Sequence, residues 1–336
     1  MTTIFFCANQ MIAVSITSGT SKHSVTDKII RFSGGEKPTI QTVPILTSHG
    51  DIPAFFDARI KWGKICPFIG KVKNQGICKS GWAIAVADVI TDRRCIKSGG
   101  KFQDKLSPMH LLSCCTNCCG CNGGHILNAW RFVLHEGLVT GGTYPEHPTF
   151  VPSDGCQPYQ IRPLMESELN KSSTFGSRTP ACKGIKCSNP KYYREEQTVF
   201  KIRSFSLLPR SNPEIIMREI MENGPVQVSF HMHEDFRLYR GGHHNKIFAH
   251  VWGKLENEHA AKLIGWGTYD DVNYWLLMNS FSRNWGENGT FRVHRTRSDH
   301  FDFGYAIIAP SISKSSSTEN YVYLIIIIKI ILFLKF

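Results

Sequence analysis

Apolar and polar positions follow a helical spacing in the first half of the chain. Apolar residues recur every three or four positions over residues 82–95, and again over residues 124–137, where the run ends at a glycine. Ser107-Pro108 is a typical helix start, in which a capping serine precedes a proline in the first turn. These patterns predict three helices in this half of the chain.

The second half of the chain shows the short runs of β-strands. A helix is predicted over residues 214–222, after Asn212-Pro213 and before the turn at residues 223–225. Strand-like apolar runs then follow at residues 226–232, 259–266, 274–280, 289–294 and 305–309. Residues 142–200 are rich in Pro, Ser and Cys and are expected to form long, disulfide-held loops. A helical half followed by a β half predicts an α+β protein with two packed lobes.

The two ends of the chain differ from its middle. Residues 1–50 are polar and turn-rich, so regular structure is expected to begin near Asp51. Apolar residues among the first 14 positions form a weak signal-peptide pattern, which Asn9-Gln10 interrupts. Residues 311–336 are a polar linker and an apolar tail that is shorter than the roughly 20 residues needed to span a bilayer. A cleaved lipid-anchor signal and translated non-coding sequence both fit this tail, and no membrane partner is expected.

The number and spacing of the cysteines indicate the compartment of the protein and argue against a metal site. Of the 336 residues 42% are hydrophobic, and eleven of the 12 cysteines fall between Cys66 and Cys187. This density predicts disulfides in a secreted (extracellular) or lysosomal protein, and the odd number in the stretch predicts an unpaired thiol or an intermolecular bridge. No second, regularly spaced Cys or His set follows the cluster at residues 114–121, so neither a metal nor another cofactor is expected.

The net charge of the chain is +12, and its basic residues are scattered. Nucleic-acid binding is not expected, because no basic stripe is interleaved with aromatic residues. Two interpretations of the charge remain open, namely a solvated basic surface and adhesion to acidic matrix polysaccharide.

Most of the residue types of a cysteine protease are present at widely separated positions. Cysteine catalysis needs a thiolate beside an imidazole, an Asn that orients the imidazole, and a Gln side chain that stabilises the oxyanion. Gln75 precedes the helix that starts near Trp82, and His259 and Asn279 lie in strand-like runs. A helix N-terminus favours a thiolate, but the residue at this position is Gly81, which has no side chain.

These segments resemble the papain family of cysteine proteases, and within it cathepsin B, over about residues 51 to 310. Other matching segments are residues 51–53, 56–59, 111–115, 121–124, 223–226 and 285–289. Residues 107–108, 214–217, 221–227 and 233–236 are also similar to the non-catalytic branch that includes tubulointerstitial nephritis antigen, whose members lack the nucleophile. The resemblance implies a papain-like fold with a helical left lobe, a β-barrel-like right lobe and a cleft between them.

The resemblance assigns roles to individual residues. Gln75 is implied to be the oxyanion donor, Gly81 to occupy the position of the lost nucleophile, and His259 with Asn279 to form the catalytic pair. The substrate groove is implied to be lined by Gly123, Gly124 and Ala306. Two neighbours of the pair depart from the family pattern. Glu258 replaces a glycine and is expected to crowd the cleft and, if the imidazole is close, to raise the pKa of His259. Phe281 replaces a tryptophan that shields the Asn–His hydrogen bond.

The same resemblance implies the disulfide pairing. The implied pairs are Cys66–Cys95, Cys78–Cys121, Cys114–Cys182, Cys156–Cys187 and Cys115 with either Cys118 or Cys119. One of these last two cysteines is expected to stay unpaired. Because Cys78 belongs to a structural pair, it is not expected to replace the missing nucleophile.

Gly81 therefore predicts a catalytically inactive cathepsin B-like protein. Such a protein would bind peptides, protease inhibitors or matrix without cutting them. The competing interpretation is an active cysteine endopeptidase, which requires that Gly81 be a sequence error. Residues 164–167 lack the histidine pair that gives cathepsin B its dipeptide-removing activity, so that activity is not expected. Residues 33–50 resemble only the end of a propeptide.

Overall fold

The computed structural model describes residues 28–34, 37–42, 50–144, 155–165, 168, 178–188, 192–193, 199–241, 247–295 and 302–312. The α-helices are α1 (Ala58–Trp62), α2 (Gly81–Lys97), α3 (Pro108–Cys114), α4 (Ile126–His135), α6 (Pro213–Asn223) and α7 (Glu234–Arg237). The strands are β1 (Lys28–Ser33), β2 (Thr39–Thr42), β3 (Phe56–Asp57), β4 (Ser204–Leu207), β5 (Val226–His233), β6 (Leu255–Tyr269), β7 (Val272–Met278), β8 (Thr290–His294) and β9 (Ala306–Ser311).

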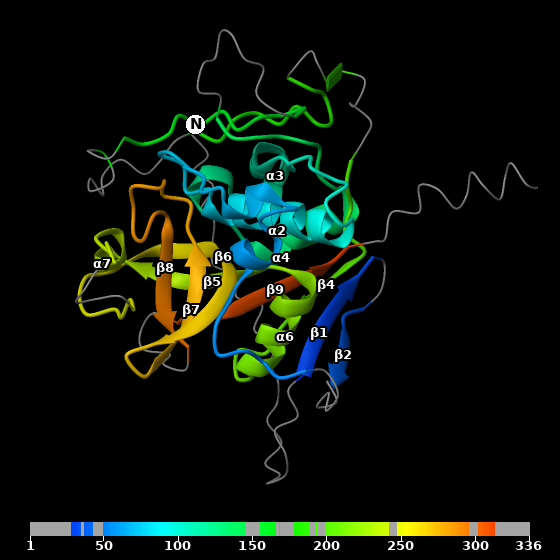
Figure 1. Ribbon diagram of the computed structural model, residues 1–336. Coiled ribbons are helices and arrows are strands. Elements are labelled where there is room, and N and C mark those ends of the chain that lie inside the picture. Colours follow the sequence, from blue (N-terminus) through cyan, green and yellow to red (C-terminus); the bar gives the residue numbers. More distant parts are fainter. Residues whose placement is uncertain are drawn as a thin grey trace, which may run out of the picture.

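The described strands form one antiparallel sheet in the order β2-β1-β4-β9-β5-β6-β7-β8, and β3 pairs with β6. The two edge strands, β2 and β8, pair with one neighbour each, so this sheet is open and is not a closed barrel. Figure 1 shows α2, α3 and α4 together on one side of β5 to β8, with α6 near β9. No helix among the described residues is long and apolar enough to span a membrane.

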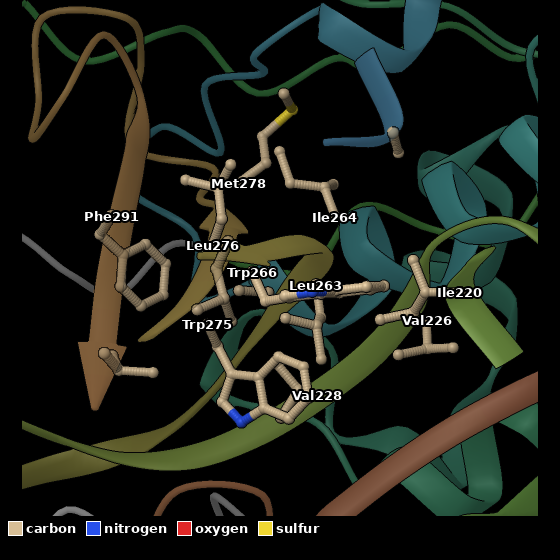
Figure 2. Close-up of a cluster of buried hydrophobic side chains, with 14 of the residues drawn as sticks. Ile220, Val226, Val228, Leu263, Ile264, Trp266, Trp275, Leu276, Met278 and Phe291 are labelled. Atoms are coloured by element: carbon tan, nitrogen blue, oxygen red, sulfur yellow. The ribbon is translucent and has the colours of Figure 1, made fainter. Parts of the chain in front are cut away.

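Buried apolar side chains form two large clusters that correspond to two lobes. One cluster joins the strands β5 to β8 with α1 and α6, and Figure 2 shows Trp266, Trp275 and Leu263 at its centre. The other joins α2, α3 and α4 with Phe205 of β4 and with Ala306 and Ile308 of β9. The predicted α+β fold with a helical lobe and a β lobe is therefore confirmed.

Helix α2 is the structural centre because it packs against both lobes. Most of its residues from Gly81 to Cys95 are buried, which is typical of a helix that is covered on all sides. The other helix boundaries follow their capping residues. Ser107 Oγ accepts the His110 N–H at 2.9 Å, as the Ser-Pro start predicted, and α4 ends just before Gly137, whose φ is +83°.

The expectation that regular structure begins near Asp51 is wrong. Strands β1 and β2 form a hairpin, and β1 extends the sheet by pairing with β4 from Phe32↔Phe205 to Ile30↔Leu207. The ring of Phe32 stacks on that of Phe205 with centroids 4.7 Å apart. The hairpin was missed because its partner strand lies about 170 residues away, and a pairing over that distance leaves no local sequence pattern.

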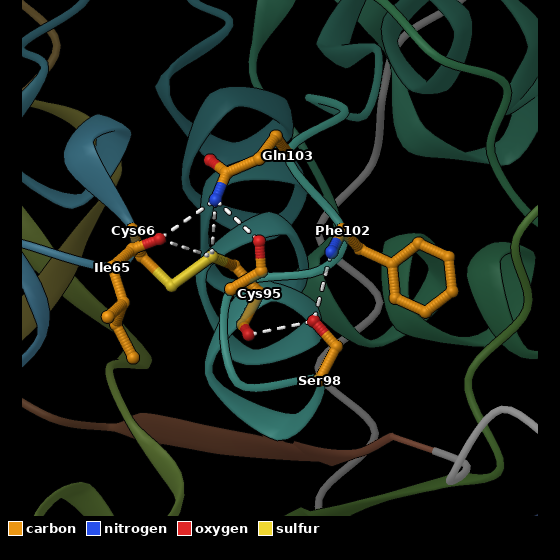
Figure 3. The surroundings of a disulfide bond; sticks show 7 residues. Ile65, Cys66, Cys95, Ser98, Phe102 and Gln103 are labelled. Atoms are coloured by element: carbon orange, nitrogen blue, oxygen red, sulfur yellow. Dashed lines mark hydrogen bonds between the residues drawn. A yellow bond between two sulfur atoms is a disulfide. The ribbon is translucent and has the colours of Figure 1, made fainter.

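Five disulfides lie among the described residues, namely Cys66–Cys95, Cys78–Cys121, Cys114–Cys182, Cys115–Cys118 and Cys156–Cys187. Figure 3 shows the first pair, beside which Gln103 Nε2 donates to the carbonyl of Ile65 at 2.8 Å. The prediction of an unpaired cysteine is wrong for the described residues. Cys115 pairs with Cys118, and Cys119 is also disulfide-bonded. Each such bridge typically stabilises a small fold by about 2–4 kcal/mol.

Candidate active site

Helix α2 begins at the site with the backbone N–H groups of buried residues. Ser80 is the N-cap residue, and its carbonyl accepts the N–H groups of Ala83 and Ile84 at 2.9 and 3.1 Å. The Ser80 hydroxyl does not cap the helix, because it lies 2.5 Å from the hydroxyl of Tyr159. The N–H groups of Gly81 and Trp82 consequently have no hydrogen-bond acceptor among the described residues.

The sheet brings His259 and Asn279 together beside this helix end. His259 lies on β6, and Asn279 directly follows β7, its antiparallel neighbour. His259 Nε2 and Asn279 Oδ1 are 2.8 Å apart, and the same oxygen accepts the Ser280 N–H at 2.8 Å. Because an amide oxygen only accepts, His259 Nε2 carries the proton and Nδ1 is the unprotonated nitrogen of the neutral ring.

The imidazole of His259 lies next to Gly81, which has no side chain. A Cβ added at Gly81 would lie 2.5 Å from His259 Cε1 and 3.0 Å from His259 Nδ1. Real Cβ atoms do not approach a ring so closely, so any side chain at position 81 would have to displace the imidazole slightly. Gly81 and His259 are therefore adjacent, with Nδ1 directed towards the start of α2.

Aromatic rings enclose the His259–Asn279 pair. The rings of Phe281 and Phe230 lie 5.0 and 5.4 Å from the imidazole, and Asn279 is 3% exposed. The pKa of His259 is lowered to about 4, mainly by burial; the Asn279 hydrogen bond acts in the opposite direction, and the positive charge of Arg237 adds to the lowering. Phe281 thus lies beside the Asn279–His259 hydrogen bond, at the position that the resemblance implies for a shielding ring.

The prediction that Glu258 raises the pKa of His259 is wrong. Neighbouring residues of a strand point to opposite faces, so the two side chains diverge. Glu258 instead accepts the hydroxyl of Tyr305 at 3.1 Å, on the outer face of β6. Burial among the aromatic rings determines the pKa of the histidine.

His259 should titrate near pH 4 in the folded protein. Its folded pKa lies below the ordinary value of 6.5, so the neutral ring stabilises the fold above pH 6.5 and this contribution is lost as the pH falls towards 4. The Cε1–H resonance of His259, assigned by its loss in His259→Gln, gives the pKa directly by NMR. A midpoint at or above 6.5 would show that the ring is not buried as described.

Gln75 completes the group of predicted site residues. Its Oε1 atom lies 3.0 Å from the Cβ position of Gly81 and accepts the hydroxyl of Ser280 at 2.7 Å. Its Nε2 atom donates to the Cys78 carbonyl at 2.9 Å, which fixes the orientation of the amide because a carbonyl only accepts. The structure therefore places Gln75, Gly81, His259 and Asn279 together, and their catalytic roles stay a prediction.

The three predicted groove residues lie in different surroundings. Gly124 packs so closely on Trp82 that a Cβ would lie 2.2 Å from the indole, which explains the need for glycine. The Cβ position of Gly123 has no atom within 4 Å and its φ is +116°, so its outer side is open. Ala306 is 6% exposed on β9, where it pairs with Ser229 of β5. A groove role for these residues stays a prediction.

Two ion pairs, one buried and one partly buried, lie behind the site, and the sequence did not predict them. Asp92 of α2 accepts Lys262 Nζ of β6 at 2.7 Å, and both side chains are at most 3% exposed. One helical turn nearer to Gly81, Asp88 pairs with Lys73. Two aspartates four residues apart in an apolar helix were the available signal, because buried carboxylates require partners.

No free thiol and no cluster of three or more metal-ligating side chains occurs in the described part of the chain. Cys78, the cysteine nearest in sequence to Gly81, is bonded to Cys121 and cannot act as a nucleophile in this state.

Comparisons with known proteins identify the family of the chain. The sequence profile of the papain family cysteine proteases matches residues 52–311. Cathepsin B-like cysteine proteinase 4 of Caenorhabditis elegans is 36% identical over 269 residues, covering 79% of this chain and 77% of that protein. A cathepsin B-like cysteine proteinase of Schistosoma japonicum is 36% identical over 253 residues, covering 74% of this chain and 70% of that protein.

A solved structure gives the same result for the fold. The proCathepsin B S9 structure from Trypanosoma congolense superposes with a TM-score of 0.63 at 28% identity, covering 79% of this chain and 80% of that chain. The profile match extends from just before β3 to the last residue of β9 and includes all four site residues. The chain is therefore a member of the papain family of cysteine proteases, with cathepsin B-like proteinases among its relatives.

Proposed function

We propose that this chain binds peptides or protein segments in a papain-like cleft and does not hydrolyse them. The observation that carries the proposal is Gly81 at the start of α2, where the resemblance places the nucleophile. His259, Asn279 and Gln75 surround this position, yet residue 81 offers no atom that could attack a carbonyl. Loss of the nucleophile typically lowers turnover by about a million-fold.

The remaining features of the fold support a protein that has kept a binding function. Disulfides hold each buried cluster together, and the buried Asp92–Lys262 ion pair joins helix α2 of one lobe to β6 of the other. The disulfides also favour an oxidising compartment, so we propose secretion or delivery to lysosomes. Ligands of this cleft would be peptides and protease inhibitors, and the net charge of +12 favours acidic matrix as a further partner.

Binding without cleavage can be measured directly. We expect a fluorescently labelled peptide library to contain members whose anisotropy rises on addition of the protein, and mass spectrometry should recover these peptides intact after a day. The control is Gly124→Trp, in which the bulky side chain cannot fit against Trp82 and should disturb the groove. Rapid fragmentation of the bound peptides would contradict the proposal.

A further inference from the structure

A two-residue turn precedes strand β8. The backbone groups of Glu287 and Thr290 exchange two hydrogen bonds, at 2.8 and 3.1 Å, around Asn288-Gly289. Both central residues have a left-handed backbone, with φ values of +54° and +85°. Asn-Gly is the usual sequence of such a turn, so these two residues alone indicate only a change of chain direction.

The residue that follows the turn adds a chemical meaning to the sequence. Asn288-Gly289-Thr290 matches the pattern Asn-X-Ser/Thr, with X other than proline, which accepts an N-linked glycan in secreted proteins. The pattern needs a hydroxyl two residues after the asparagine, and Thr290 supplies it. The chain has one other match, Asn170-Lys171-Ser172, which lies outside the described residues.

The folded turn leaves the side chain of Asn288 available. Asn288 is exposed, and its amide makes no hydrogen bond within the part of the chain that the structure describes. Thr290 is 3% exposed, and its hydroxyl donates to the Glu287 carbonyl at 2.7 Å. The nitrogen that would carry a sugar is therefore accessible, while the threonine holds the turn in place.

The opposite side of the same turn supports the candidate site. The carbonyl of Gly289 accepts the Asn279 N–H at 2.9 Å. A Cβ at Gly289 would lie 2.5 Å from Val72 Cγ1, so the turn also packs on the segment that leads to Gln75. A glycan on Asn288 would thus lie on the outer side of a turn whose inner side holds Asn279, and it need not displace either contact.

We propose that Asn288 is the acceptor of an N-linked glycan. Its side-chain nitrogen, Nδ2, attacks the anomeric carbon of an oligosaccharide carried on a lipid diphosphate. A C–N bond forms, the C–O bond to the diphosphate breaks, the lipid diphosphate leaves with the electron pair, and Nδ2 loses one proton. The inference rests on the proposed secretory route, because this glycan donor belongs to that route.

The test is a direct measurement of the modification. The full chain is expressed in insect cells behind a supplied signal peptide, which ensures that it enters the secretory pathway. Peptide N-glycosidase in heavy-oxygen water converts each glycosylated asparagine into a labelled aspartate, which mass spectrometry locates. We expect most secreted copies to carry the label at Asn288. An unlabelled Asn288 would overturn the inference, whether or not Asn170 is labelled.

Matched variants test whether the acceptor pattern is responsible. Asn288→Asp keeps a residue type that tolerates the left-handed turn but removes the amide nitrogen, so the protein should lose one glycan. Thr290→Ser keeps the hydroxyl and should keep the glycan, whereas Thr290→Val keeps the shape without the hydroxyl and should lose it. Thermal unfolding verifies that the variants fold. A glycan at Asn288 that persists in Thr290→Val would contradict the assignment.

The outcomes separate this inference from the proposed function. An unlabelled Asn288 in a chain that has entered the pathway overturns the acceptor site and leaves the proposed peptide binding and secretion standing. Fractionation of the organism's own cells, with an antibody against the protein, tests secretion by itself. A protein confined to the cytosol would remove the proposed secretion, and with it the use of Asn288 as an acceptor.

Discussion

Gly81→Cys should convert the protein into a working cysteine peptidase. The new thiol would stand at the positive end of α2 and beside His259 Nδ1, and both would favour its thiolate form. Since loss of a nucleophile costs about a million-fold in turnover, its return should raise hydrolysis of a fluorogenic dipeptide from background by several orders of magnitude. The gain should fall short of the full factor, because the added Cβ must first displace the imidazole.

The matched control for this experiment is Gly81→Ala. It introduces the same Cβ and the same displacement of His259 but no sulfur, so it should stay at background. A second readout is the thiol itself, which should react with iodoacetamide well below pH 8.5 if the imidazole is paired with it. A folded, silent Gly81→Cys with an unreactive thiol would show that more than the nucleophile has been lost from this site.

Lys262→Met should lower the free energy of unfolding by about 3–5 kcal/mol, the usual result when one partner of a buried ion pair is removed. The substitution leaves Asp92 charged and unpaired at the contact between α2 and β6, where both side chains are at most 3% exposed. The double variant Asp92→Asn with Lys262→Met should regain much of the loss, because no uncompensated charge remains. Urea denaturation at pH 7.5 measures all three free energies.

The pH dependence of Lys262→Met provides an independent check. Burial raises the pKa of Asp92 from 3.8 to about 6, although Lys262 acts in the opposite direction, so removal of the lysine should raise it further. A folded pKa above the unfolded value means that the fold takes up the proton first, and acid favours the fold in this range. The deficit of the variant should therefore shrink as the pH falls towards 6 and stay constant below it, where Asp92 is protonated in both proteins.

An exposed ion pair supplies the comparison for the buried one. Arg218 and Glu214 form an i,i+4 pair on α6, with the carboxylate side chain 56% exposed. Arg218→Met should cost less than about 1 kcal/mol, because solvent screens such pairs. If Lys262→Met were equally mild at pH 7.5, the buried pair would not hold the two lobes together as proposed.

Local sequence signals account for the parts of the fold that could be predicted. Ser107-Pro108 and Asn212-Pro213 mark helix starts, and Asn212 Oδ1 indeed accepts the Glu214 N–H at 3.1 Å. The motif resemblance then supplied the disulfide pairs and the grouping of Gln75, His259 and Asn279. These features depend on residue types at fixed spacing, which a single sequence contains.

The features that were missed depend on distant partners or on side-chain direction. Nothing near β1 reveals that its partner is β4. The orientation of Glu258 was available from strand alternation, since a residue next to His259 must face away from it. The imidazole can lie next to Gly81 because no Cβ is present there and because Asn279 holds the ring by a hydrogen bond. These two contacts join distant parts of the chain, so only the three-dimensional structure reveals them.

Hydrolysis of a fluorogenic dipeptide by the purified wild-type protein tests the central claim most directly. The assay should run from pH 4 to pH 8, with and without a thiol-directed inhibitor, after intact-mass analysis has verified glycine at position 81. The account predicts a signal indistinguishable from buffer at every pH. Cleavage that the inhibitor abolishes would contradict it, because a thiol other than the disulfide-bonded Cys78 would then have to act in the cleft.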